Sequence, residues 1–119
     1  MFNKVGVISL PVTDQQRAKT FFETLGFEVV RDDPYMDEMR WIELSPKGAD
    51  TTISLVTWFD KMPAGGVQGL VLKTEDIEGA HKMVEASDAS DITPIDKAPW
   101  GSSFMFTDTE GNGWIVQQD

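Results

Sequence analysis

The sequence predicts an α+β fold built from two copies of a β-α-β-β-β unit. The first observation behind this prediction is an internal repeat: the run V-I-S-L-P-V-T-D at 7–14 matches G-L-V-L-K-T-E-D at 69–76, in alternation and in its final acid. The same offset aligns Ile42 with Phe104, both in apolar alternating runs. Internal repetition decides a fold before any single motif does. Each copy is one small supersecondary unit, so the two copies are expected to pair.

The first copy starts with an alternating run of apolar and polar residues, which is typical of a strand. Asp14 then has the position and chemistry of a helix N-cap, and Gly26 suits the left-handed residue that ends a helix. The residues D-D-P-Y that follow the second strand predict a turn. The elements expected are a strand at 5–12, a helix from the Asp14 cap to about Thr24, and strands at 27–31, 39–44 and 51–58.

The second copy repeats this order after a hinge, M-P-A-G-G, at 62–66. Its last two strands flank D-T-E-G-N-G, a strong hairpin signal. The elements expected are a strand at 67–73, a helix after the Asp76 cap, a short strand near Ile92, and strands at 102–107 and 113–118. We therefore expect one domain over 1–119, with module one at about 1–61 and module two at about 67–119.

Composition excludes several classes of function. The chain has 119 residues, no cysteine and a formal net charge of −10. Nucleic-acid binding depends on neutralising phosphates with Lys and Arg, so this charge argues against it. No apolar run is long enough to cross a bilayer, and the N-terminus M-F-N-K-V-G-V lacks the layout of a signal peptide. The sequence thus predicts a cytoplasmic protein that binds neither nucleic acid nor membranes.

Two motifs resemble one known superfamily. They are D-Q-Q-R-A-K-T-F-F-E-T-L-G-F at 14–27 and D-T-E-G-N-G-W at 108–114. Together with the paired units they are similar to the vicinal-oxygen-chelate superfamily, which includes glyoxalase I, extradiol dioxygenases, fosfomycin-resistance enzymes and bleomycin-binding proteins. The resemblance covers essentially the whole chain. It implies a cupped mixed sheet with helices outside and the ligand inside, and it implies a homodimer.

Metal-dependent members of this superfamily hold a divalent ion with His or Glu on the first and last strands of each unit. Carried onto this sequence, those positions are Val7, Gly69, Ile115 and either Ser54 or, one residue away, Ile53. Aliphatic side chains and glycine offer no lone pair, and one serine hydroxyl is a poor ligand. The chain also has only one histidine, His81, predicted on the second helix outside the cup. We therefore expect no metal and no cofactor.

Strand alternation separates the residues that face the helices from those that face the cup. The apolar set expected under the helices is Ile42, Leu44, Ile53, Leu55, Phe104, Phe106, Trp114 and Val116. The ligand-binding set expected in the cup is Trp41, Glu43, Ser54, Lys73, Trp100, Ser103, Met105 and Gln117. Such a mixture of aromatic and hydrogen-bonding groups suits an organic ligand. Trp41 and Trp100 are expected to contact its ring, although dimer-interface or core roles explain such tryptophans equally well.

Three functions are compatible with these residues. The first is a metal-independent binding protein that takes an organic metabolite or drug in the cup. The second is an enzyme of the same fold, a lyase, isomerase or dioxygenase, in which Glu43 would act as a general base with Lys73, Gln117 or a bound cofactor. The third is an interaction module whose cup is filled by its own side chains. The absent metal ligands and the inward Trp, Ser and Gln residues favour the first.

Overall fold

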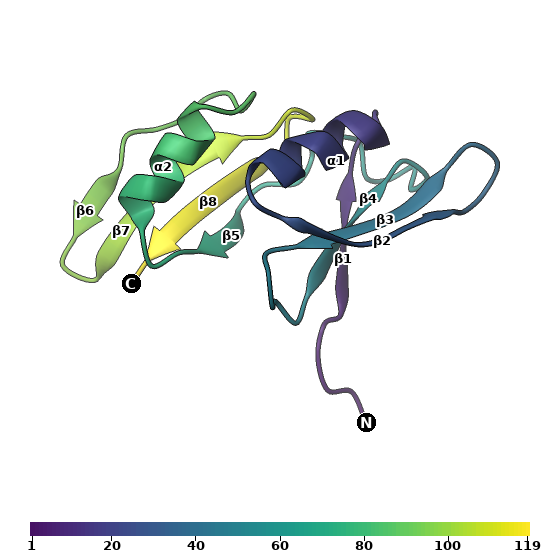
Figure 1. The fold of residues 1–119 in the computed structure, drawn as a ribbon, viewed down its shortest axis with the longest axis horizontal. Coiled ribbons are helices and arrows are strands. Elements are labelled where there is room, and N and C mark those ends of the chain that lie inside the picture. The colour runs from purple at the N-terminus through teal and green to yellow at the C-terminus, as the bar shows by residue number, and fades with distance from the viewer.

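The computed structural model describes all of residues 1–119 and confirms the α+β class, with one four-stranded mixed sheet and one helix in each half (Figure 1). Module one holds β1 (Val7–Pro11), α1 (Gln15–Thr24), β2 (Glu28–Pro34), β3 (Arg40–Ser45) and β4 (Thr52–Val56). Module two holds β5 (Leu70–Lys73), α2 (Ile77–Glu85), β6 (Asp96–Ala98), β7 (Gly101–Thr107) and β8 (Gly113–Gln118). The strand orders, β1-β4-β3-β2 and β5-β8-β7-β6, are the same, and in each sheet only the first pair is parallel. The repeat in sequence is therefore a repeat in topology.

The two helices begin where the capping residues predict. The side chain of Asp14 accepts a hydrogen bond from the backbone N–H of Arg17 at 3.0 Å, and Asp76 accepts one from Gly79 at 3.0 Å. Each bond satisfies an N–H that has no partner within the helix. After α1 the chain turns at Gly26, whose φ of 87° is strained for residues with a Cβ.

Several strands are shorter than predicted: β1, expected at 5–12, spans Val7–Pro11, β4, expected at 51–58, spans Thr52–Val56, and β5, expected at 67–73, spans Leu70–Lys73. Two other differences matter more. β2 continues through D-D-P to Pro34, where a turn was expected, because Asp32 is bound by Arg40 of the neighbouring strand. Since β2 lies at the sheet edge, the missing N–H of Pro34 removes no ladder bond. In module two no strand forms at Ile92. The strand that follows α2 is β6, at Asp96–Ala98, farther along the chain. Pro94, which has no N–H to donate, interrupts the earlier segment.

Both helices lie on the same side of the two sheets, and the core beneath them is shared between the modules (Figure 1). The apolar set expected under the helices is confirmed: seven members are buried and Ile53 packs against them. Phe22 of α1 reaches across to Trp114 of β8, with ring centroids 5.4 Å apart. Trp114 in turn stacks on Phe106 at 6.3 Å. Module one therefore buries its helix partly against the sheet of module two.

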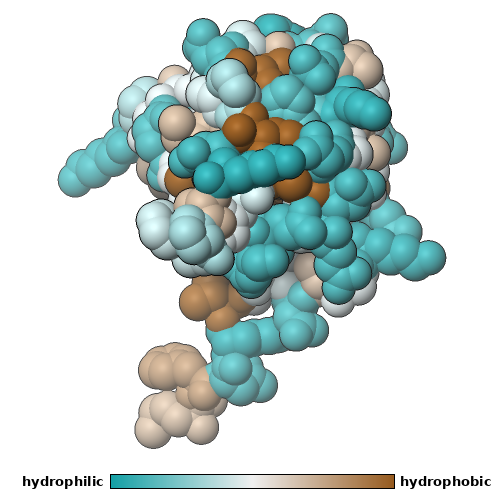
Figure 2. Space-filling model, turned by 90° about the vertical axis from the view of Figure 1, so that its left-hand side faces the viewer, coloured by the Kyte–Doolittle hydropathy of each residue, from teal (hydrophilic) through white to brown (hydrophobic).

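The N-terminal segment leaves the body of the molecule, and Met1 and Phe2 are fully or almost fully exposed (Figure 1). The side of the molecule seen in Figure 2 is largely hydrophilic with small hydrophobic areas. Neither helix has the length and apolar character that crossing a membrane requires.

Candidate functional site

The face of each sheet opposite the helices, here called the open face, carries the polar and aromatic residues expected to meet a ligand. Strand alternation is as predicted for the core, because the buried apolar residues of β3, β7 and β8, and Leu55 of β4, lie on the other face. Val56 of β4 is also buried, but it lies on the open face. The open-face residues of module one include Val7, Ser9, Trp41, Glu43, Thr52 and Ser54. Those of module two include Val71, Lys73, Ser103, Met105, Ile115 and Gln117.

Three aromatic side chains from three segments of module one pack together, and we call them the aromatic wall: Tyr35, Trp41 and Trp58. The indoles of Trp41 and Trp58 are stacked, with centroids 6.0 Å apart and planes 25° apart. The ring of Tyr35 lies 5.2 Å from Trp41 and 4.8 Å from Trp58. Tyr35 is 47% exposed, and the two indoles are partly exposed. The wall is thus an accessible aromatic surface rather than buried core.

A ligand ring has no space between the two indoles. Inserting one would need a separation of about 7 Å, twice the roughly 3.5 Å contact distance between carbon atoms, whereas the Trp41 and Trp58 centroids are 6.0 Å apart. A planar molecule would therefore bind against the outside of the aromatic wall. Phe59, 48% exposed and 6.2 Å from Trp58, extends this apolar surface.

Glu43 lies beside the aromatic wall and is 8% exposed. Its Oε2 accepts a hydrogen bond from the indole N–H of Trp41 at 2.5 Å, and its Oε1 accepts one from the hydroxyl of Thr52 at 2.8 Å. Ser54, directly across from Glu43 on β4, is 1% exposed and its hydroxyl has no hydrogen-bond partner. The polar groups under the wall are therefore mostly engaged with one another.

The hairpin that carries Tyr35 is held by a charged network on the helix side. Asp32 of β2 binds Lys19 of α1 at 2.8 Å and the guanidinium of Arg40 on β3. The hydrogen bond from Arg40 lowers the pKa of Asp32; burial opposes this and Lys19 adds to it. The pKa of Arg40 is raised by the same hydrogen bond. Each residue thus stabilises the charged form of the other. Their ion pair connects β2 to β3 just before the loop that carries Tyr35.

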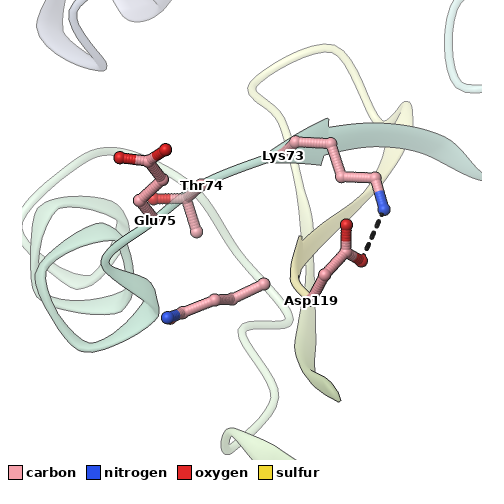
Figure 3. A pocket seen from close by; sticks show the side chains of 5 residues that line it. Lys73, Thr74, Glu75 and Asp119 are labelled. Atoms are coloured by element: carbon pink, nitrogen blue, oxygen red, sulfur yellow. Dashed lines mark hydrogen bonds and ion pairs between the residues drawn. The ribbon is translucent and has the colours of Figure 1, made fainter. Parts of the chain in front are cut away.

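Module two presents a polar strip on its open face. Lys73 Nζ donates to Gln117 Oε1 at 2.9 Å and pairs with Asp119 at 3.0 Å, beside a shallow pocket at the end of β5 (Figure 3). Ser103 lies opposite Gln117 on β7, and both line a second small pocket with Trp100. This strip offers an amine, an amide, a hydroxyl and a carboxylate, all suited to hydrogen bonding.

The eight residues expected in the cup fall into two groups in one chain. Module one holds Trp41, Glu43 and Ser54, and module two holds Lys73, Trp100, Ser103, Met105 and Gln117. Trp100 is 84% exposed in the turn between β6 and β7, whereas Trp41 lies on β3, at the other end of the molecule in Figure 1. The chain by itself does not bring these two tryptophans together.

The positions that hold a metal in metal-dependent relatives do not suit one here. In module one, Ser54 on β4 lies between its strand partners Ser9 on β1 and Glu43 on β3. In module two, Ile115 on β8 lies in the same way between Val71 on β5 and Met105 on β7. Ser54, not Ile53, is therefore the structural counterpart of Ile115. Three of the four positions are then Val7, Gly69 and Ile115, none with a side-chain donor. No group of three His, Cys, Asp or Glu side chains in the structure is arranged to hold an ion.

Sequence reasoning missed Tyr35, and it does not include Trp58 among the expected ligand-binding residues. The motif D-D-P-Y predicts a turn at Tyr35, but the longer β2 carries Tyr35 to the position next to Trp41. Trp58 follows β4 in a loop, where alternation gives no direction for a side chain. A signal was present, since four of the chain's 12 aromatic residues occur in 35–59, outside the helices.

The chain shares its sequence pattern and fold with a defined family. Residues 4–116 match the family model of the Glyoxalase/Bleomycin resistance protein/Dioxygenase superfamily, and the chain belongs to that superfamily. It is 31% identical to the protein YetH of Bacillus subtilis over 99% of this chain and 100% of YetH. The crystal structure of TnmS3, an antibiotic binding protein from Streptomyces sp. CB03234, is similar with a TM-score of 0.90 and 37% identity, covering 98% of this chain and 96% of TnmS3. A superfamily member from Sphaerobacter thermophilus gives a TM-score of 0.83 at 28% identity, covering 99% and 98% of the two chains.

Proposed function

We propose that this protein binds a planar organic molecule, a metabolite or a drug, on the aromatic wall, without a metal ion or cofactor. The observation that carries the proposal is the stacked and partly exposed pair Trp41 and Trp58, joined by Tyr35. Rigid aromatic side chains offer a large contact area at a small entropic cost. The antibiotic-binding description of TnmS3, 37% identical, supports the same class of ligand.

The enzymatic alternative has less support in the geometry. Glu43 is the acid closest to the aromatic wall, but it is 8% exposed and both of its oxygens accept hydrogen bonds from neighbouring side chains. A general base must reach the proton that it removes. The residues at the metal positions also offer no way to polarise a substrate. A binding protein needs neither feature.

We further propose that two chains associate so that the polar strip of one module two completes the site on the aromatic wall of its partner. Val71 and Met105 on the open face of module two are 46% and 52% exposed, which leaves apolar surface for such a contact. This arrangement would bring Lys73, Ser103 and Trp100 to the ligand, as the sequence predicts.

A titration with acridone, an uncharged planar tricycle, tests the proposed function. We expect it to quench tryptophan fluorescence saturably, and to do so equally in the presence of a chelator. Trp41→Ala should weaken binding by about 2 kcal/mol, the size of an aromatic hot spot. Phe2→Ala, an exposed aromatic on the N-terminal segment, is the matched control and should not change the affinity. Equal binding by folded Trp41→Ala, or a metal that remains at one per chain after dialysis, would contradict the proposal.

A further inference from the structure

We infer that Glu43 is a positioning residue, which fixes the indole of Trp41 in the orientation that the aromatic wall requires. The inference rests on the proposed function, and it assigns Glu43 a role other than that of a general base. Trp41 and Glu43 are two residues apart on β3, so their side chains emerge on the same face. The indole N–H of Trp41 donates to Glu43 Oε2 at 2.5 Å, which is shorter than the usual N–H···O distance of about 2.7–3.2 Å.

The second oxygen of Glu43 is also held. Thr52 on β4 donates its hydroxyl to Oε1 at 2.8 Å, which fixes the carboxylate from the neighbouring strand. A partly exposed indole whose N–H had no hydrogen-bond partner would exchange between rotamers. With the N–H bound, the ring plane of Trp41 is set, and it meets Trp58 at 25° and Tyr35 at 68°. Thr52 thus fixes the carboxylate of Glu43, and Glu43 in turn fixes the ring of Trp41 that would contact the ligand.

This arrangement has a consequence for the ligand. Two donors already compensate the charge of Glu43, and the carboxylate is 8% exposed. Because so little of the carboxylate is exposed, a cation on the ligand would have little access to it. The wall should therefore select ligands by the area and planarity of an uncharged ring system, and a positive charge should add little.

Two substitutions separate positioning from charge. In Glu43→Gln the amide oxygen can accept from Trp41 while its NH₂ donates to the Thr52 hydroxyl, which is able to accept. This variant should bind acridone within about twofold of the parent. Glu43→Ala removes both bonds and should weaken acridone binding on the order of tenfold, about 1.4 kcal/mol. If Glu43→Gln loses as much affinity as Glu43→Ala, the charge itself acts and the inference is wrong.

Near-ultraviolet circular dichroism gives a readout that needs no ligand. Stacked indoles produce a coupled signal, which Trp58→Phe should abolish. We expect Glu43→Ala to lose that same signal and Glu43→Gln to keep it. An unchanged spectrum in Glu43→Ala would overturn the inference even if acridone binds. Conversely, failure of the parent to bind acridone would count against the proposed function, while the spectra still decide the role of Glu43. As a further check, 9-aminoacridine, the cationic counterpart, should bind no more than about twofold more tightly than acridone.

Discussion

Glu110, in the turn between β7 and β8, accepts two hydrogen bonds from Thr13, at the start of the first helix in the other module. The backbone N–H and the hydroxyl of Thr13 bind Glu110 Oε1 at 2.6 and 2.8 Å. Its other oxygen accepts from the N–H of Asp14 at 3.2 Å. In the same turn Asn112, fully buried, donates to Pro11 O at 2.8 Å and accepts from Gly65 N at 3.0 Å. The turn therefore joins module two to module one and to the hinge between them.

We predict that Glu110→Ala destabilises the protein by about 2 kcal/mol, because it leaves the N–H groups of Thr13 and Asp14 without their charged acceptor. Urea unfolding followed by tryptophan fluorescence measures this change. Glu38→Ala, an exposed glutamate in the loop between β2 and β3, is the control and should change stability by less than about 0.5 kcal/mol. Equal effects of the two substitutions would show that the contact between modules contributes little.

The second prediction concerns pH and Asp108. Burial raises the pKa of Asp108, while hydrogen bonds from Trp114 and from the backbone of Glu110 and Asn112 oppose the rise. A raised carboxyl pKa means that the folded state holds the proton more tightly than the unfolded state. The stability that Asp108 contributes is thus fully present below about pH 3.9, its unfolded value, and declines as the pH rises through the higher folded value.

Asp108→Asn provides the comparison, because asparagine does not titrate. Its oxygen can still accept from the backbone, but its NH₂ would face the N–H of Trp114, so we expect a loss of about 1–3 kcal/mol at low pH. The difference between parent and variant should be smaller at about pH 7 than at about pH 3.5. Urea unfolding of both proteins across this range measures it. A difference that grows with pH would mean that the sign of the shift is wrong.

The third prediction is that the protein is a homodimer in solution. Light scattering at micromolar concentration should give a mass of about twice 13.3 kDa. Met105→Lys places a charge on the open face of module two and should shift the mass towards one chain. Met83→Lys is the matched control, since Met83 is 48% exposed on α2, on the other side of the sheet. A parent mass near that of one chain would contradict the prediction.

Features that depend on residues close together in the chain were predictable. The cap at Asp14 needs only the N–H of Arg17, three residues on, and the turn at Gly26 needs only its missing Cβ. Alternation placed Ile42 under the helices and Trp41 on the opposite face, because neighbouring side chains on a strand point to opposite faces. The repeat predicted the shared topology of the two sheets for the same reason, since each unit is local.

The end of β2 shows where local reasoning failed. D-D-P-Y is typical of a turn, yet the pairing of Asp32 with Arg40 and Lys19 extends the strand to Pro34. Arg40 and Lys19 lie eight and 13 residues from Asp32, outside the four-residue turn motif, and their charges outweigh a weak local preference. For the same reason Tyr35 was not predicted at the site, because alternation predicts the direction of a side chain only within a strand.

By itself, the sequence determined two β-α-β-β-β modules, their capped helices, the apolar faces under those helices and the superfamily to which the chain belongs. Only the tertiary structure decided which aromatic residues meet and how the modules are joined. Tyr35, Trp41 and Trp58 come from a loop, a strand and another loop, and Glu110 reaches Thr13 from the far end of the chain. The physical reason is that capping and alternation are set by bonds between near neighbours, whereas ring stacking and buried hydrogen bonds require side chains that only the folded backbone brings within reach.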